Sequence, residues 1–349
     1  MPVERKTELN YMNAVGCLLV ILIHVLSLGI SNAERSSVQA AVIYFPWRLA
    51  SFVVPMFLYT GAVKMAQQFD GKTITLRVYA DYCLRRVQKI YLPYVIWVMI
   101  YYLCFWRIGY VKGELRELFS YLLIGNLSSL FYYIVIVMQF YFLMPLWIWI
   151  IRHVPFQLSL GTSLLLTFCM QQFGGWMSLL SVPFRYTDRL FLTYIFFWIW
   201  GLYAGKDYER AKSLLIRGKR AGAACGGVIA LCAALAYLQY RGVPVPVNMN
   251  DVKLAADYLA IVSLHSLCVR WTKAPARFQT ILGAIARSSF FVYLSHCLFL
   301  TLGTYHAQQL GLNRLSVLLP VRALICYIVP FVLFFVLKKL EGRMRRKKA

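Results

Sequence analysis

Long runs of hydrophobic positions, separated by short polar segments, organise this chain. Several runs reach the length of about 18 residues or more that one transmembrane helix needs. They are continuous, whereas the strands of a membrane β-barrel alternate. We therefore expect an all-α polytopic membrane protein, a bundle of about ten transmembrane helices that forms a single integral membrane domain over residues 1–349. The predicted spans are about 12–30, 42–64, 88–106, 129–151, 157–176, 190–205, 222–240, 254–271, 287–305 and 317–337.

Composition agrees with this pattern. Hydrophobic residues make up 60% of the chain and charged residues 14%, and no soluble domain of this size could bury so much apolar surface. The first apolar segment lacks a small-x-small cleavage site and further spans follow, so we expect it to be a span and not a cleavable signal. The nine cysteines lie in or beside apolar segments without a CxxC pair. We interpret them as packing residues.

The net charge of +24 raises the question of nucleic acid. With the N-terminus inside, 26 of the 37 Lys and Arg residues fall in inner segments, and only Arg48 and Arg322 fall within spans. This asymmetry predicts an even number of spans with both termini cytoplasmic. The asymmetry favours the lipid bilayer, and not nucleic acid, as the partner of the basic residues. We therefore expect a multi-pass protein of the cell membrane, namely the inner membrane of a bacterium.

The first span carries polar side chains along one face. His24 lies roughly 18 Å along the helix from Met12, slightly past the middle of the membrane. Asn13 precedes His24 by almost three whole turns and shares its face, and Asn10 flanks that face. A neutral imidazole can take or give a proton near neutral pH, which suits a general base. The alternative is a histidine that only packs helices together through a hydrogen bond.

Ionisable residues inside spans are functional candidates by default, and two more of them are candidate site residues, His296 and Arg48. His296 lies near the middle of the ninth span, beside Tyr293 and Ser295. It is a candidate to orient His24 or the acceptor, or a structural hydrogen-bonded histidine. Arg48 either extends its side chain to the outer interface or points into a polar cavity and meets an anionic group.

A basic run, "RRVQKIYLPY", starts the third span on its cytosolic side. Arg85 and Lys89 are four residues apart and share a helix face, with Arg86 beside them. Such a group can hold phosphates. The alternative is that these residues only anchor the helix end at the inner leaflet.

The order of five segments resembles the acyltransferase family 3 membrane proteins, over essentially the whole chain. The segments are "LLVILIHVLS", "VVPMFLYTGAVKM", "LRRVQKIYLPYVIWV", "LFYYIVIVMQFYFLMPLW" and "SSFFVYLSHCLFL". The resemblance implies a membrane-bound enzyme that O-acylates surface glycans or related envelope molecules, with His24 as the family's first-span histidine.

The chain departs from the family pattern at one place. Relatives commonly carry an Arg 11 residues before this histidine and often an Asp three residues before that Arg, and the positions here hold Asn13 and Asn10. An Asn can hydrogen-bond an acyl carbonyl or a pantetheine amide but cannot pair with a phosphate. Either the charge comes from another span, from Arg48 or the basic run, or the chain has an altered activity.

The resemblance implies acetyl-CoA or another acyl-CoA as co-substrate and no metal. We expect Arg85, Arg86 and Lys89 to meet the phosphates of the donor and Asn13 to contact its pantetheine arm. His24 would act as general base on an acceptor hydroxyl, or carry the acyl group transiently. The acceptor would be an envelope glycan or a lipid-linked sugar.

The alternative function is a transporter, flippase or export component for a lipid-linked polysaccharide, although the sequence shows no inverted repeat.

Overall fold

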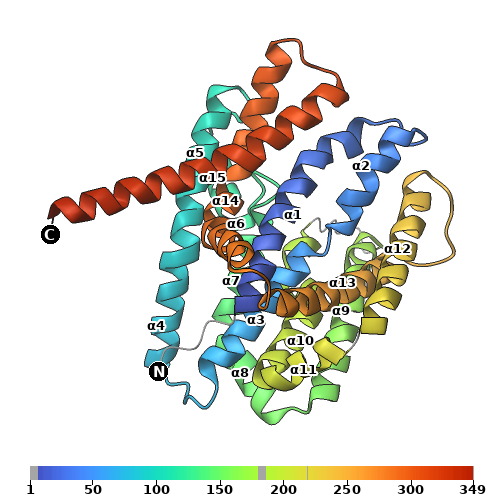
Figure 1. The fold of residues 1–349 in the computed structure, drawn as a ribbon, viewed down its shortest axis with the longest axis vertical. Coiled ribbons are helices and arrows are strands. Elements are labelled where there is room, and N and C mark those ends of the chain that lie inside the picture. The colour runs from blue at the N-terminus through green and yellow to red at the C-terminus, as the bar shows by residue number, and fades with distance from the viewer. Residues whose placement is uncertain (1–6, 180–185, 218, 349) are drawn as a thin grey trace. The chain divides into compact units, whose positions relative to one another are not determined.

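The computed structural model describes residues 7–179, 186–217 and 219–348, and every regular element in these ranges is a helix (Figure 1). The all-α prediction is therefore confirmed for the described part of the chain. The helices fall into two compact units. Among the described residues, the terminal unit comprises residues 7–53 and those from 215 to 348, and the middle unit comprises those from 54 to 214. The prediction of one integral membrane domain stays a prediction.

Six helical stretches in the described residues are long and apolar enough to cross a membrane, or seven with one bent pair. They are Thr7–Asn32, Val38–Phe69, Leu76–Arg107, Met249–Trp271, Ala276–Gln309 and Leu315–Arg345, and the bent pair is Tyr132–Phe142 with Met144–His153. Each coincides with a predicted span, which supports a multi-pass membrane protein. The total of ten spans and the cytoplasmic location of both termini stay predictions.

The terminal unit is built from six helices that the chain contributes from both of its ends. They are α1 (Thr7–Asn32), α2 (Val38–Leu49), α12 (Lys219–Tyr240), α13 (Met249–Trp271), α14 (Ala276–Gln309) and α15 (Leu315–Lys348). In this unit α1 packs against α2, α13, α14 and α15, and α12 packs against α2 and α13 (Figure 1). Two of the helices begin at side-chain caps: Ser37 accepts from the amide of Ala40, and Asn248 accepts from that of Asn250.

The helix α1 lies at the centre of the terminal unit, where it contacts four other helices. Cys17, Ile21 and Val25 of α1 form a buried cluster with the α14 residues Val292 and Leu300. Gly29 lets α2 approach, since a Cβ there would lie 2.7 Å from the Cδ1 of Ile43. With neighbours on several sides, the polar residues of α1 are placed among other helices.

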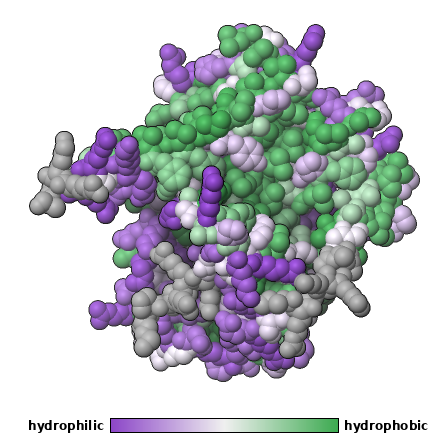
Figure 2. All heavy atoms as spheres, in the orientation of Figure 1, coloured by the Kyte–Doolittle hydropathy of each residue, from purple (hydrophilic) through white to green (hydrophobic). Residues whose placement is uncertain are grey.

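The outer face of α15 is apolar and uncovered within the structure. Leu324, Ile328 and Val332 repeat every four residues and remain about half exposed, at 60%, 51% and 54%. Figure 2 shows hydrophobic side chains along this helix and hydrophilic ones towards its C-terminal end. An exposed apolar stripe of this length, followed by a basic tail, is what a helix in contact with lipid requires.

The middle unit is also a set of helices. They are α3 (Val53–Phe69), α4 (Leu76–Arg86), α5 (Leu92–Arg107), α6 (Leu115–Ile124), α7 (Tyr132–Phe142), α8 (Met144–His153), α9 (Phe156–Leu179), α10 (Ile195–Lys206) and α11 (Tyr208–Arg217). A π-helical turn, Val87–Tyr91, joins α4 to α5. The helices α7 and α8 meet at an angle of 58° beside Pro145, which has no amide hydrogen to continue the first helix.

Close packing of α3 and α10 depends on two glycines of α10, which are four residues apart. A Cβ at Gly201 would lie 2.5 Å from the carbonyl oxygen of Tyr59, and one at Gly205 would lie 2.6 Å from that of Val63. Small residues at this spacing allow two membrane helices to approach until their backbones touch.

The predicted span at 190–205 differs from the structure, because the α-helix begins only at Ile195. Two 3₁₀ turns, Thr187–Arg189 and Phe191–Tyr194, precede α10. Gln139 of α7 supplies hydrogen bonds to this backbone: its Nε2 donates to the carbonyl of Arg189 at 2.7 Å, and its Oε1 accepts from the amide of Phe191 at 3.2 Å. These hydrogen bonds satisfy backbone groups that a regular α-helix would have bonded within itself.

Candidate functional site

The two predicted catalytic histidines lie together in the terminal unit. His24 of α1 and His296 of α14 have ring centroids 5.2 Å apart, with the ring planes inclined at 51°. His296 is completely buried, whereas His24 is half-buried. The packing of α1 on α14 thus brings side chains that are far apart in the sequence into one centre, which we call the histidine centre.

The ring of His296 is fixed by its own helix. Its Nδ1 lies 3.0 Å from the carbonyl oxygen of Val292 and 2.8 Å from that of Tyr293. A carbonyl oxygen only accepts, so Nδ1 carries the hydrogen and donates it. In the neutral ring, Nε2 therefore holds the free lone pair, which is the arrangement a general base or a ligand atom needs.

A thiol completes the histidine centre. The Sγ of Cys297 lies 3.3 Å from the Nε2 of His296. One donor atom from each of His24, His296 and Cys297 lies within 4.8 Å of the other two. Two imidazoles and a thiol are also ligand types that suit Zn²⁺, so these residues are the ones that could hold a metal. The sequence prediction of no metal is not tested by this geometry.

A buried cation contacts the backbone of His24. Arg322 of α15 is 6% exposed. Its Nη2 donates to the carbonyl oxygen of His24 at 2.8 Å and its Nε to that of Val25 at 3.1 Å. Its Nη1 donates to the hydroxyl of Thr304 at 2.8 Å. One guanidinium therefore ties α15 to both α1 and α14 at the level of the histidine centre.

The charge of Arg322 is not balanced by an acid in the described residues, where its partners are two carbonyls and a hydroxyl. A guanidinium so deep in a helix bundle costs several kcal/mol to desolvate, and each hydrogen bond from a charged donor returns only about 1.5–3 kcal/mol. An arrangement of this kind is typical of functional positions in membrane proteins. A positive charge beside His24 also repels a divalent metal ion.

Asn13, the residue that replaces the family's arginine, lies on α1 as predicted and is half-buried. Its spacing from His24 along an unbroken helix keeps both side chains on one face. Its contact with a pantetheine arm stays a prediction.

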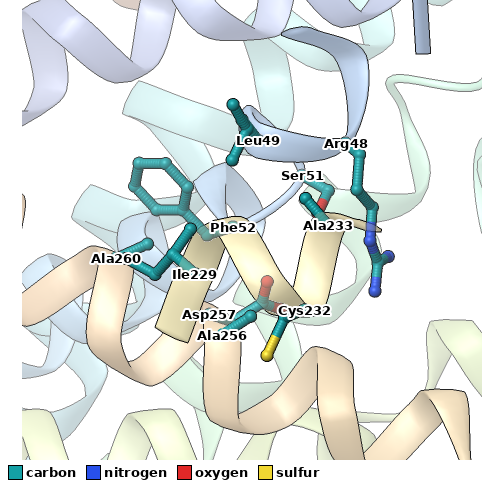
Figure 3. A pocket seen from close by; sticks show the side chains of 10 residues that line it. All are labelled: Arg48, Leu49, Ser51, Phe52, Ile229, Cys232, Ala233, Ala256, Asp257 and Ala260. Carbon is teal, nitrogen blue, oxygen red and sulfur yellow. The ribbon is translucent and has the colours of Figure 1, made fainter. Parts of the chain in front are cut away.

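Arg48 lines a different site from the histidines. Its side chain and that of Asp257 border a hollow of about 20 Å³ between the end of α2 and the helices α12 and α13 (Figure 3). This volume suits a single water molecule. Asp257 is 3% exposed and forms an ion pair with Lys253 one turn earlier on α13. Arg48 and Asp257 thus line the same hollow, and the ion-pair partner of Asp257 is Lys253. Both interpretations of Arg48 stay predictions.

The basic run lies in the middle unit. Arg85 and Lys89 are exposed, whereas Arg86 is half-buried. The guanidinium of Arg86 stacks on the rings of Tyr82 and Tyr141, 4.8 and 4.5 Å from their centroids. Arg86 thus has a packing role in its unit, and Arg85 and Lys89 are the members of the run whose charges are open to a ligand. Their binding of phosphates stays a prediction.

Three residues of these sites, Arg322, Asp257 and Cys297, were not assigned to a site from the sequence. Arg322 and Asp257 carried a usable signal, since each is an ionisable residue within a predicted span. Cys297 carried none, because a cysteine in an apolar helix is most often a packing residue. Only the structure shows that its thiol meets the lone pair of His296.

Comparisons with known proteins identify the family to which this chain belongs. The acyltransferase domain of family 3 matches residues 6–339. The chain therefore belongs to acyltransferase family 3. The match runs through both units, and no solved structure matches the chain.

Curated relatives are distant. A protein of Bacillus subtilis (strain 168), named as the membrane-bound acyltransferase YfiQ, is 23% identical over 318 residues, which cover 85% of this chain and 81% of that protein. Proteins named as poly-β-1,6-N-acetyl-D-glucosamine export proteins also match. The one from Staphylococcus epidermidis is 23% identical over 84% of this chain and 81% of its own length. The one from Staphylococcus aureus (strain MSSA476) is 24% identical over 61% of this chain and 60% of its own length.

Proposed function

We propose that this protein is a membrane-bound O-acyltransferase that moves an acyl group, by expectation acetyl, from a cytosolic acyl-CoA to a hydroxyl of an envelope glycan or a lipid-linked sugar. The observation that carries this proposal is the pairing of His24 with His296, at 5.2 Å, inside a family 3 acyltransferase fold. Acyl transfer to a hydroxyl needs a base for the hydroxyl proton and a positive group where negative charge develops on the carbonyl oxygen.

His24 is the base in this proposal. Its imidazole is half-buried, so an acceptor hydroxyl can approach it, while His296 is enclosed. His24 removes the hydroxyl proton as the oxygen attacks the acyl carbon. Arg322 orients the turn of α1 that carries His24 through the bond to its carbonyl. Its charge also favours the oxyanion that forms in the transition state.

The donor is proposed to bind through two groups of different chemistry. Arg85 and Lys89 are exposed cations suited to phosphates. Asn13 offers an amide to the polar pantetheine arm. The glycan nature of the acceptor is supported by the names of the staphylococcal relatives, which refer to a polysaccharide. The proposed location is the cell membrane, with the donor on the cytosolic side.

The second candidate function is a component of polysaccharide export. The observation that favours it is that these same relatives are named as export proteins, and one of them aligns with 84% of this chain. In that function the histidine centre and Arg322 would line a path for a glycan without making or breaking a bond.

Reconstitution into vesicles separates the two functions. Purified protein is given acetyl-CoA labelled in the acetyl group, with a crude lipid-linked glycan fraction as acceptor. Release of free CoA thiol together with label in the glycan supports the transferase. Movement of glycan across the vesicle membrane without release of CoA supports export and contradicts the transferase. The matched control is His265→Gln, which alters a buried histidine of α13 that has no part in the proposed mechanism.

A further inference from the structure

The thiol of Cys297 differs from other buried thiols of the terminal unit in what it contacts. The Sγ of Cys17 donates to the carbonyl of Ser289 at 3.8 Å, and that of Cys326 donates to the carbonyl of His296 at 3.5 Å. Both are backbone contacts of packing residues. The Sγ of Cys297 lies 3.3 Å from the Nε2 of an imidazole whose other nitrogen contacts two backbone carbonyls. A thiol at this distance can give its proton to the lone pair of that nitrogen.

This is the order of groups that activates a nucleophile. The thiol is the nucleophile, the Nε2 of His296 is its base, and the carbonyls of Val292 and Tyr293 hold the base in the required tautomer. When His296 takes the proton, both of its nitrogens donate, and the two carbonyls stabilise the resulting imidazolium.

We propose that Cys297 carries the acyl group as a thioester between the donor and the acceptor, an inference that rests on the proposed function. The donor is itself a thioester, so exchange onto another thiol is nearly balanced in energy and can run in both directions. A covalent carrier inside the bundle also allows CoA to leave before the acceptor hydroxyl arrives.

In the first step, His296 takes the proton of the Cys297 thiol and the sulfur attacks the carbonyl carbon of the acyl-CoA. A bond forms between Sγ and the acyl carbon, and the bond from that carbon to the CoA sulfur breaks. The CoA thiolate takes the proton from His296 and leaves as free CoA. The enzyme then holds acyl-Cys297, and both histidines are neutral again.

In the second step, His24 takes the proton of the acceptor hydroxyl as its oxygen attacks the acyl carbon. An ester bond forms, and the bond from the acyl carbon to Sγ breaks. The proton passes from His24 to the released thiolate, directly or through His296, whose ring lies 5.2 Å from that of His24. The products are the O-acylated acceptor and free Cys297, so no oxidant, reductant or metal is consumed.

The two steps assign different roles to residues in contact, and isotope exchange separates these roles. Purified protein is incubated with acetyl-CoA and radiolabelled CoA in the absence of acceptor. The formation of labelled acetyl-CoA measures the first step alone. We expect exchange in the native protein, and retention of exchange with loss of overall transfer in His24→Gln. We expect Cys297→Ala to lose exchange by at least a hundredfold, and intact-mass analysis to show a single acetyl adduct that hydroxylamine removes.

The control for the loss of a buried thiol is Cys326→Ala, which removes a sulfur that is 0% exposed on the neighbouring helix. This variant should retain exchange if it is folded. Cys297→Ser is a second test, because it keeps the size and hydrogen-bonding capacity of the side chain but should form no hydroxylamine-sensitive thioester. Folding of each variant is checked by its thermal midpoint in detergent.

Three results would overturn the inference. The first is overall transfer in the native protein without any exchange, which indicates direct transfer and leaves the proposed function intact. The second is exchange that survives in Cys297→Ala but not in His24→Gln, which places the acyl group on His24. The third is stoichiometric metal in the purified protein with exchange that a chelator abolishes. Absence of both exchange and transfer in the native protein would instead contradict the proposed function itself.

Discussion

The guanidinium of Arg322 donates to the backbone carbonyl of His24 at 2.8 Å, although 298 positions separate the two residues in the sequence. The carbonyl of His24 also accepts from the hydroxyl of Ser27 at 2.7 Å. A helix carbonyl with two donors besides its own helix amide is firmly positioned, and the imidazole of the same residue is positioned with it. The resemblance implies an arginine 11 residues before the first-span histidine, where this chain has Asn13. In the structure a cation reaches that histidine from the last helix.

Replacement of Arg322 tests whether this cation serves the reaction. Arg322→Gln should lower transfer by about ten- to hundredfold, since a hydrogen bond from a charged donor is worth about 1.5–3 kcal/mol. Arg322→Lys keeps the charge but not the fork of donors, and should recover part of the turnover number. Thr304→Val removes only the α14 partner of Arg322 and serves as the control for a structural loss.

Steady-state kinetics with acetyl-CoA distinguish the outcomes. A fall in turnover with recovery in the lysine variant supports the electrostatic role. If Arg322→Gln and Thr304→Val lose equal activity in proportion to their loss of thermal stability, Arg322 only ties the helices together.

The Nε2 of His296 can be tested separately from its Nδ1. An Asn at this position can still donate from its amide to the carbonyls of Val292 and Tyr293 but offers no ring nitrogen to Cys297. His296→Asn should therefore remain folded, with a destabilisation of about 1 kcal/mol, while transfer falls by about a hundredfold or more. Activity assays and thermal unfolding in detergent provide the two readouts. Equal activity of His296→Asn and the native protein would reduce His296 to a structural residue.

Binding of the donor is expected to depend on Arg85. Arg85→Gln should raise the KM for acetyl-CoA by several-fold to about tenfold, and the effect should weaken at high ionic strength because the side chain is exposed. Arg48→Gln is the matched control, since Arg48 lines the hollow that contains Asp257. An unchanged KM for acetyl-CoA in Arg85→Gln would contradict the phosphate role of Arg85. A raised KM in Arg48→Gln would instead indicate that Arg48 contributes to donor binding.

The close contact of α3 with α10 predicts that one methyl group added at Gly201 strongly lowers the stability of the protein. Gly201→Ala places its Cβ against the carbonyl oxygen of Tyr59, and backbone cannot move aside as a side chain can. We expect a loss of about 1–3 kcal/mol in stability. Gly161→Ala, on α9, meets no atom within 4 Å and should be neutral or stabilising by up to about 1 kcal/mol. Thermal midpoints of the two variants in detergent check this contrast, and equal midpoints would contradict the packing argument.

The helical architecture could be predicted because hydrophobic length is a local property of the sequence. Most of the long helices therefore coincide with predicted spans. The interrupted region before α10 could not be predicted, since its backbone relies on Gln139, a residue far along the chain. The helical repeat also predicted that His24 shares one face of α1 with Asn13.

The composition of the histidine centre depends on contacts between distant segments. The sequence indicated His24 and His296 separately, and only packing of α1 on α14 sets their rings 5.2 Å apart. Arg322 was visible as a charge in a span, but nothing in the sequence assigned it to the first helix. In the sequence Cys297 looks like the other cysteines, because its contact with the Nε2 of His296 depends on how that ring is oriented.

The central claim is that His24 is the residue on which acyl transfer depends. Its most direct test is the transfer of labelled acetyl from acetyl-CoA to a glycan fraction by native protein and by His24→Ala, with equal amounts of folded protein. General base catalysis contributes about 10²–10⁴-fold. We therefore predict that His24→Ala retains about 1% of native transfer or less, while its thermal midpoint shows that it is folded. Transfer by His24→Ala within threefold of the native rate would contradict the account.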